Sequence, residues 1–227
     1  KAVLPPRYRG TPAVAHGFRE DMAAVSVDGK WGYVDRMGTL ALLPTFEDAG
    51  DFQEGLACVS PERDKWGYID KTGKFVIPPV YGLLSQGFSE GLAAVNVARR
   101  WGYINKNNEV VIPPRDYSFV GCFREGRAPF HVGKGVPGEK AGFIDTTGAV
   151  VIQPTFTTAR QFFEGLAAVK DGRKWGFVDR DGVMAIKAQF DMVHSFAEGL
   201  AAVNVGAKYA ANESPAPGAL SFPQGGK

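Results

Sequence analysis

The chain has 227 residues, of which 26 are basic and 24 acidic, so its charges nearly cancel. No long block of like charges occurs, and this excludes the electrostatic pattern of a nucleic-acid or membrane-surface binder. The longest apolar runs, such as Leu40 to Leu43, are far shorter than the ~20 residues of a transmembrane helix. We therefore expect a soluble chain that neither inserts into a membrane nor binds nucleic acid.

The first feature along the chain is a string that returns later. Lys1 to Pro6 matches Lys74 to Pro79, which indicates internal repeats and places the first residues at the end of one repeat. A glycine in an F-x-E-G context then recurs at a period of about 35 residues, followed each time by a short apolar run that predicts a strand. We name this run strand A; it occupies residues 22–25, 56–59, 92–95, 127–130, 166–169 and 200–203.

A second strand, strand B, follows a polar turn and begins with a Trp-Gly pair in most copies. We expect the tryptophan to pack in the core, because its indole buries a large apolar surface, and the glycine to admit a neighbouring backbone. An exposed aromatic ladder that stacks on sugars is the alternative. The pairs begin at Trp31, Trp66, Trp101 and Trp175, and Ala141 takes the place of tryptophan in the fourth copy.

A D-x-x-G turn leads to the third strand, strand C. The turn aspartate can accept backbone N–H groups, with calcium binding as the competing role, and the turn glycine marks a position with positive φ. Asn108 replaces this glycine in one copy, which supports the interpretation because Asn tolerates positive φ better than most residues. Strand C occupies residues 39–43, 74–77, 109–112, 149–152 and 183–186 and is expected to end at the proline that commonly follows it.

Together these elements predict an all-β protein of tandem three-stranded antiparallel meanders in an open superhelical or solenoid-like array. The alternative is a closed propeller-like ring of about six units, whose blades usually have four strands. The segment after strand C, such as residues 46–52, is a turn of helix or a fourth short strand, and we treat it as a connection. Residues 1–206 form one domain of five full units with flanking strands, and residues 207–227 form a Pro/Ala/Gly-rich extended turn or mobile tail.

Several strings carry a resemblance to a known family. EGLAAV, KWGYID and WGFVDRDG resemble the WG-repeat family, also called KWG repeats, which occurs in many bacterial proteins. The resemblance covers residues 1 to about 206 and implies β-rich repeats, often at the bacterial surface or envelope or in signalling, with no catalytic residues to transfer. We therefore expect a location in the bacterial envelope, periplasm or exterior, with the cytoplasm as the alternative.

Residues that recur in every repeat are expected to serve the repeat itself. A glutamate precedes the position of the recurring glycine in every repeat, and a basic residue precedes the Trp-Gly pair. We expect the glutamates and the basic residues to form ion pairs across strands A and B. The glutamates are Glu20, Glu54, Glu90, Glu125, Glu164 and Glu198, and the basic residues are Lys30, Lys65, Arg100, Lys140, Lys174 and Lys227.

The sequence contains no motif of a familiar catalytic site. His16, His131 and His194 have no His or Cys at metal-ligand spacing, and no nucleophile-elbow, zinc-protease or phosphate-loop string is present. Cys58 and Cys122 fall at different positions of repeats two apart, so we interpret both as packed thiols. The chain is expected not to be an enzyme and to bind no metal or cofactor.

The fourth repeat departs most from the others and supplies the candidate binding residues. Function concentrates where loops vary, although a tolerated insertion in an exposed turn explains the same pattern. The candidates are Arg127, His131, Lys134, Glu139 and Lys140.

The sequence favours a non-enzymatic interaction module that binds a protein or a cell-envelope polymer through its repeat surface. The alternatives are a structural spacer or scaffold segment of a longer protein, and a carbohydrate-binding aromatic ladder. The last strand A, residues 200–203, is not followed by a recognisable strand B, so its edge is also expected to be able to accept a strand from a partner.

Overall fold

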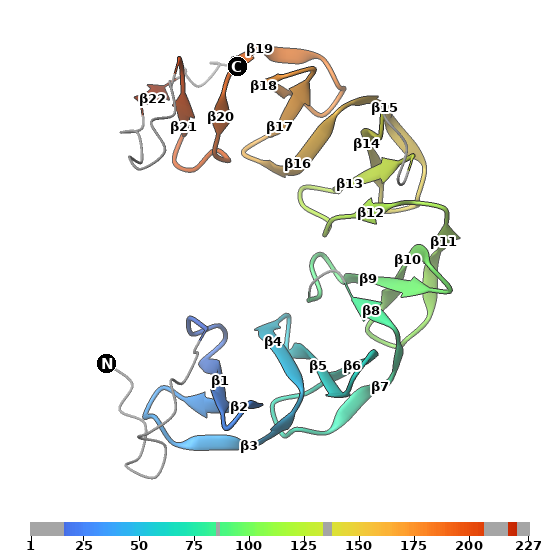
Figure 1. The fold of residues 1–227 in the computed structure, drawn as a ribbon, viewed down its shortest axis with the longest axis vertical. Coiled ribbons are helices and arrows are strands. Elements are labelled where there is room, and N and C mark those ends of the chain that lie inside the picture. The colour runs from blue at the N-terminus through green and yellow to red at the C-terminus, as the bar shows by residue number, and fades with distance from the viewer. Residues whose placement is uncertain (1–15, 85–86, 134–137, 207–217, 222–227) are drawn as a thin grey trace. The chain divides into compact units, whose positions relative to one another are not determined.

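The computed structural model describes residues 16–84, 87–133, 138–206 and 218–221, and the regular elements in these ranges are all β-strands. The chain divides into two compact units, residues 1–115 and 116–227, and each contains three separate antiparallel sheets (Figure 1). Within the described ranges, no helix is long and apolar enough to span a membrane.

The sheets are numbered I to VI in chain order. Sheet I consists of β1 (Met22–Val27), β2 (Lys30–Asp35) and β3 (Leu40–Phe46). Sheet II consists of β4 (Asp48–Gln53), β5 (Leu56–Glu62), β6 (Lys65–Ile69) and β7 (Phe75–Tyr81). Sheet III consists of β8 (Leu83–Leu84), β9 (Leu92–Val97), β10 (Arg100–Asn105) and β11 (Val110–Arg115).

The second unit repeats this order. Sheet IV consists of β12 (Phe119–Val120), β13 (Arg127–Val132), β14 (Lys140–Asp145) and β15 (Val150–Phe156). Sheet V consists of β16 (Thr158–Phe163), β17 (Leu166–Asp171), β18 (Lys174–Val178) and β19 (Met184–Phe190). Sheet VI consists of β20 (Met192–Val193), β21 (Leu200–Asn204) and β22 (Gly218–Ser221).

The prediction of an all-β fold with tandem antiparallel sheets is confirmed, but the expected three strands are extended to four in sheets II to V. The additional strand is the segment treated above as a connection. Its residues 48–53 form β4, which pairs with β5 of the following strand A, and residues 158–163 form β16 in the same way. Four-stranded sheets are the usual blades of β-propellers, so sheets II to V have the strand number of a propeller blade.

Strand C does not end at its proline, as had been expected. β3 continues through Pro44 to Phe46, and the register of its pairing with β2 shifts along this stretch. The edge position of β3 explains why proline is tolerated there, because edge strands and bulges are where sheets accommodate it. A Cβ atom on Gly32 would lie 2.5 Å from the Leu42 carbonyl oxygen, so the glycine of the Trp-Gly pair is required by this close backbone.

The D-x-x-G turns form as predicted. The Asp35 Oδ1 atom accepts hydrogen bonds from the backbone N–H groups of Met37 and Thr39 at 2.9 and 2.8 Å. Gly38 has φ 79° and Asn108 has φ 64°, which confirms a left-handed residue at the last turn position.

The core lies between successive sheets of a unit. Tyr33 of β2 packs edge-on against Phe52 of β4, with ring centroids 4.9 Å apart, and its hydroxyl donates a hydrogen bond to the Gly50 carbonyl oxygen at 2.7 Å. Phe177 and Phe196 make the same aromatic contact between sheets V and VI at 4.9 Å. Within each unit, aromatic side chains of neighbouring sheets thus form a shared core.

The tryptophans lie against these cores. Trp101 and Trp175 are buried, whereas Trp31 and Trp66 are partly buried and pack on the edges of their clusters. The Arg160 guanidinium lies 4.6 Å from the centre of a Trp175 ring. Their main contacts are therefore those of packed core side chains.

The ends of the array differ from expectation where the structure describes them. β22 lies within residues 207–227 and pairs with β21, at the place that strand B takes in the other sheets. The edge of β21 that was expected to remain open is therefore paired. The strand C expected at residues 1–6 lies outside the described ranges.

Candidate functional site

A tight E-G turn precedes strand A, and these turns form the most regular polar feature of the chain. Around Glu90 and Gly91, Ser89 and Leu92 exchange two backbone hydrogen bonds of 2.9 and 3.2 Å. Both central residues have positive φ, 54° and 77°, as in a type I′ hairpin turn. Glycine adopts this conformation readily, whereas glutamate does so at a cost of about 1–2 kcal/mol.

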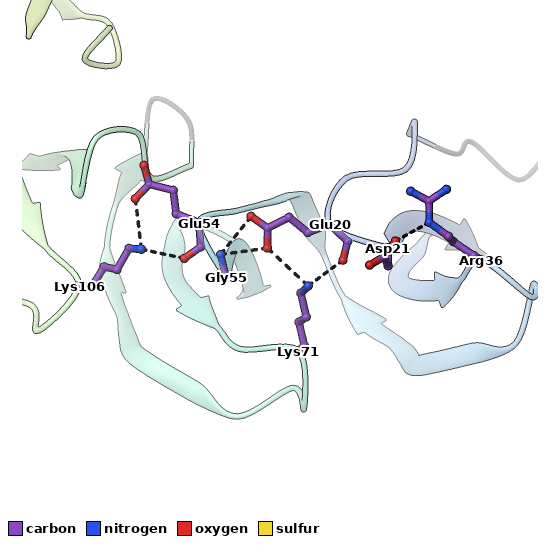
Figure 2. A network of polar contacts seen from close by, with 7 residues as sticks. All are labelled: Glu20, Asp21, Arg36, Glu54, Gly55, Lys71 and Lys106. Carbon is purple, nitrogen blue, oxygen red and sulfur yellow. Dashed lines mark hydrogen bonds and ion pairs between the residues drawn. The ribbon is translucent and has the colours of Figure 1, made fainter. Parts of the chain in front are cut away.

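The glutamate side chain offsets this cost by contacting the next sheet. The Glu20 carboxylate of sheet I accepts a hydrogen bond from the Gly55 N–H of sheet II at 3.0 Å (Figure 2). In the same way, Glu54 accepts the Gly91 N–H at 3.1 Å. The central N–H groups of a two-residue turn have no partner within their own hairpin, so the preceding sheet supplies one.

A basic side chain completes each contact. The Lys71 Nζ atom lies 2.7 Å from the Glu20 carbonyl oxygen and 3.5 Å from Glu20 Oε2. Lys106 approaches Glu54 at 2.8 and 3.2 Å in the same arrangement, and both pairs are visible in Figure 2. We name the repeated contact of a glutamate with the next turn amide and basic residue the turn ladder.

The turn ladder continues within the second unit. The Glu125 carboxylate accepts hydrogen bonds from the Gly165 N–H at 2.9 Å and from the Arg180 guanidinium at 2.7 Å. Burial opposes ionisation of Glu125, but these hydrogen bonds outweigh it and lower the pKa of the carboxyl group. Glu164 accepts the N–H groups of Glu198 and Gly199 at 2.7 and 2.8 Å.

The predicted pairing of the glutamates with the basic residues before the Trp-Gly pair is wrong. Antiparallel pairing places Val27 opposite Lys30, at the end of β1 that is far from Glu20. Lys30 instead pairs with Glu47 at 2.6 Å. The basic partner of a ladder glutamate therefore comes from the D-x-x-G turn of the next sheet, about one and a half repeats further along the chain.

The candidate binding residues of the fourth repeat lie at opposite ends of β13. Arg127 begins the strand, where most other copies have leucine, and is opposite Asp145 of β14. Its Nη1 atom donates to the Gly126 carbonyl oxygen at 3.1 Å, whereas its buried Nε atom has no hydrogen-bond partner among the described residues. Arg127 thus lies in a strand and is partly buried, so it does not belong to an exposed loop.

His131 and Glu139 both lie near the other end of the strand. Ser118 donates a hydrogen bond from its hydroxyl to Glu139, and the His131 ring contacts the Phe119 ring at 5.4 Å. Burial lowers the pKa of His131, although the nearby Glu139 charge opposes this shift. A neutral imidazole beside a carboxylate can donate or accept hydrogen bonds with a ligand, and sequence reasoning did not identify Ser118 as a member of this group.

The remaining candidates do not join this group. Lys140 extends its Nζ atom to the Thr155 carbonyl oxygen at 3.1 Å, and Lys134 lies outside the described residues. Ala141, which replaces tryptophan, is fully buried beside His131 in the register of β13 and β14. The fourth sheet therefore keeps the common register despite its unusual sequence.

Metal binding by the turn aspartates finds no support in the geometry. The Asp145 Oδ1 atom already accepts N–H groups of Thr147 and Ala149 at 2.9 and 3.0 Å. Over the described ranges, no group of three or more His, Cys, Asp or Glu side chains is placed to hold a metal ion. These carboxylates serve their own turns.

The edge strands expose aliphatic side chains that the sequence did not indicate. Strand C forms one edge of sheets I to V, and its outward positions in the first unit are largely apolar. An uninterrupted apolar run such as VVIPP is typical of a strand buried on both faces, so the pattern gave no sign of this exposure. On strand C of the first unit, the exposed large aliphatic residues are Leu43 (69%), Val80 (67%), Val110 (59%), Val76 (44%) and Val111 (41%).

Comparison with known proteins begins with the sequence. A family model described as the WG containing repeat matches the chain six times, at residues 1–31, 31–65, 66–98, 101–134, 142–175 and 175–209. No curated protein matches the chain.

Solved structures match over most of the chain. Kluyveromyces lactis Hsv2 is 10% identical, with 85% of this chain and 71% of that chain covered and a TM-score of 0.59. A eukaryotic initiation factor is 13% identical, with 88% of this chain covered and a TM-score of 0.59. The chain spans 62% of the length of that initiation-factor chain. At such low identity these likenesses show the fold alone.

Proposed function

We propose that this chain, which belongs to the WG-repeat family, is a protein-binding module whose contact surface is the row of edge strands in its first unit. A repeated β-fold suggests a protein-interaction or scaffold module in general, because stacked repeats present extended surfaces. The observation that carries the proposal is the exposure of aliphatic residues on β3, β7 and β11.

The two units differ at the same register position. The residue after the inward-facing side chain of strand C is exposed in every sheet that has this strand. It is Leu43, Pro78 or Pro113 in the first unit, and Gln153 or Lys187 in the second. The second unit has polar residues at this position, so packing does not require the apolar residues of the first unit. We assign them instead to contact with a partner protein.

The chemistry of this surface favours side-chain contact with a protein. Pro78 and Pro79 have no N–H group to donate, which hinders the addition of a partner strand to β7. Exposed Leu and Val side chains gain free energy by burial against another apolar surface, whereas a polysaccharide offers mainly hydroxyl groups. The tryptophans that would stack on sugars lie against the cores instead.

The proposal is tested with paired variants. The test variant is Leu43→Gln with Val80→Thr, because Gln153 and Thr155 occupy those register positions in the second unit. The control is Val150→Thr with Val183→Thr, which changes two aliphatic residues of the second unit that are 38% and 62% exposed. Proteins retained by the immobilised wild-type chain are identified, purified singly and titrated against all three chains by calorimetry.

Support is a saturable complex whose Kd rises about tenfold or more in the test variant, equivalent to ~1.4 kcal/mol, and is unchanged in the control. The proposal fails if no purified protein binds saturably, which leaves a spacer, or if both variants weaken binding equally.

A further inference from the structure

The turn ladder has a direction, and its last described member is an acceptor with no donor. Glu198 has the ladder geometry, with φ 55°, yet its carboxylate accepts no hydrogen bond from the described residues. Beside it Leu200 is 41% exposed, whereas its counterparts Met22 and Leu56 are 8% and 7% exposed because they pack on the following sheet. We name Glu198 and Leu200 the head patch.

Sheet I carries the complementary groups. Asp21 occupies the turn position of the glycine, with φ 69°, and its N–H donates to no other described group. Arg36 occupies the place of Lys71 after the turn aspartate, and forms an ion pair with the Asp21 carboxylate (Figure 2). Phe18 is only partly buried, whereas its counterpart Phe52 is 1% exposed. We name Phe18, Asp21 and Arg36 the tail patch.

We infer that the head patch of one copy of this chain binds the tail patch of a second copy. The contact continues an interface that the chain already uses between its own sheets. Glu198 takes the N–H of Asp21 and the charge of Arg36, as Glu20 takes Gly55 and Lys71. Leu200 packs on Phe18, as Met22 packs in one cluster with Phe52. Because the two patches differ, the contact is head-to-tail and joins copies into chains or rings.

The proposed contact between two copies is limited to the residues of the head patch and the tail patch. The neighbouring side chains Ala23, Val25 and Val34 on sheet I are already 1–3% exposed, so they offer no further area. A small interface of this kind gives weak association, which salt weakens further because its charges are exposed. The Asp21 carboxylate also lies beside the amide that Glu198 uses, and its charge opposes the approach.

These features define the experiment, which is analytical ultracentrifugation of the whole chain from micromolar to millimolar concentration. Four chains are compared: wild type, Glu198→Arg, Arg36→Glu and Asp21→Gly. Wild type is expected to associate with concentration, and each charge reversal to weaken the association constant at least about tenfold. An equimolar mixture of the two reversed chains is expected to associate again, because each supplies the charge that the other needs.

Asp21→Gly gives a test in the opposite direction. Glycine removes the opposing charge and restores the residue that the turn prefers, so association is expected to strengthen. Thermal unfolding of all four chains at low concentration checks that the fold is unchanged. The inference is overturned if wild type remains monomeric throughout, if the reversed chains associate as wild type does, if their mixture stays monomeric, or if Asp21→Gly fails to strengthen association.

Discussion

The Gly165 amide nitrogen lies 2.9 Å from the Glu125 Oε2 atom, which belongs to the preceding sheet 40 residues earlier. This hydrogen bond joins the hairpin turns of sheets IV and V, whose strands are not paired with each other. The free energy of the array therefore depends on side chains that cross from one sheet to the next.

Removing this carboxylate should destabilise the chain. Glu125→Ala leaves the Gly165 N–H and the Arg180 guanidinium without their acceptor, and we expect a loss of about 1–2 kcal/mol in the free energy of unfolding. Urea denaturation at low protein concentration measures it. The matched control is Glu198→Ala, since Glu198 has nearly the same φ, 55° against 53°, and its carboxylate accepts no hydrogen bond from the described residues. Equal losses in both variants would contradict a stabilising role for the ladder.

The glycine of the Trp-Gly pair should not tolerate a methyl group. In Gly67→Ala the new Cβ atom would lie 2.6 Å from the Ile77 carbonyl oxygen, so the backbone of β7 must move, and we expect a loss of roughly 2–4 kcal/mol. Gly82→Ala is the control, because nothing lies within 4 Å of its new Cβ atom. The urea midpoints of the two variants are compared with that of the wild type. An unchanged midpoint in Gly67→Ala would show that the backbone of β7 is not held close to Gly67.

Acid should weaken the D-x-x-G turns. The Thr147 hydroxyl and backbone N–H groups hold the pKa of Asp145 below its ordinary value of 3.8. A carboxyl group with a lowered folded-state pKa contributes stability above its unfolded pKa and loses it as pH falls through the folded value. Asp145→Asn keeps the acceptor oxygen, as Asn105 does naturally, but cannot be protonated. We expect similar stability near pH 7 and a smaller loss at pH 3 than in wild type, measured by urea unfolding; parallel losses would contradict the assignment.

Cys58 should resist thiol reagents in the folded chain. Burial raises the pKa of its thiol to about 12, so roughly one thiol in ten thousand is ionised at pH 8. In a Cys122→Ser chain, mass spectrometry should detect labelling of Cys58 only after urea is added. Rapid labelling without urea would mean that the space between sheets II and III opens readily.

The sequence predicted the parts of this fold that depend on local chemistry. Strands, D-x-x-G turns and the close backbone at the Trp-Gly glycine follow from patterns within one repeat, and the structure contains each of them. β12 and β20 were missed because two residues are too few for a period-2 pattern to appear. The continuation of β3 past Pro44 was missed because the rule that proline ends a strand does not hold at a bulged edge.

Contacts between repeats were harder to predict. The basic partner of Glu20 is Lys71, 51 residues away, and nothing within one repeat distinguishes it from Lys30. Of the fourth-repeat candidates, His131 and Glu139 lie near one end of β13, whereas Arg127 lies at the other end. Deviation from a repeat identifies unusual positions, whereas which of them meet depends on strand register.

The direction of the turn ladder bears on how such a protein can change its length. The middle sheet of each unit receives a carboxylate from the sheet before it and offers one to the sheet after it, as sheet II does with Gly55 and Glu54. A duplicated repeat inserted by recombination would meet neighbours that already present the matching groups on both sides, and a deleted one would leave two compatible surfaces facing each other. A gain or loss of a whole repeat should therefore change stability by about one repeat and one interface, and relatives with different numbers of repeats can arise without any new interface having to evolve.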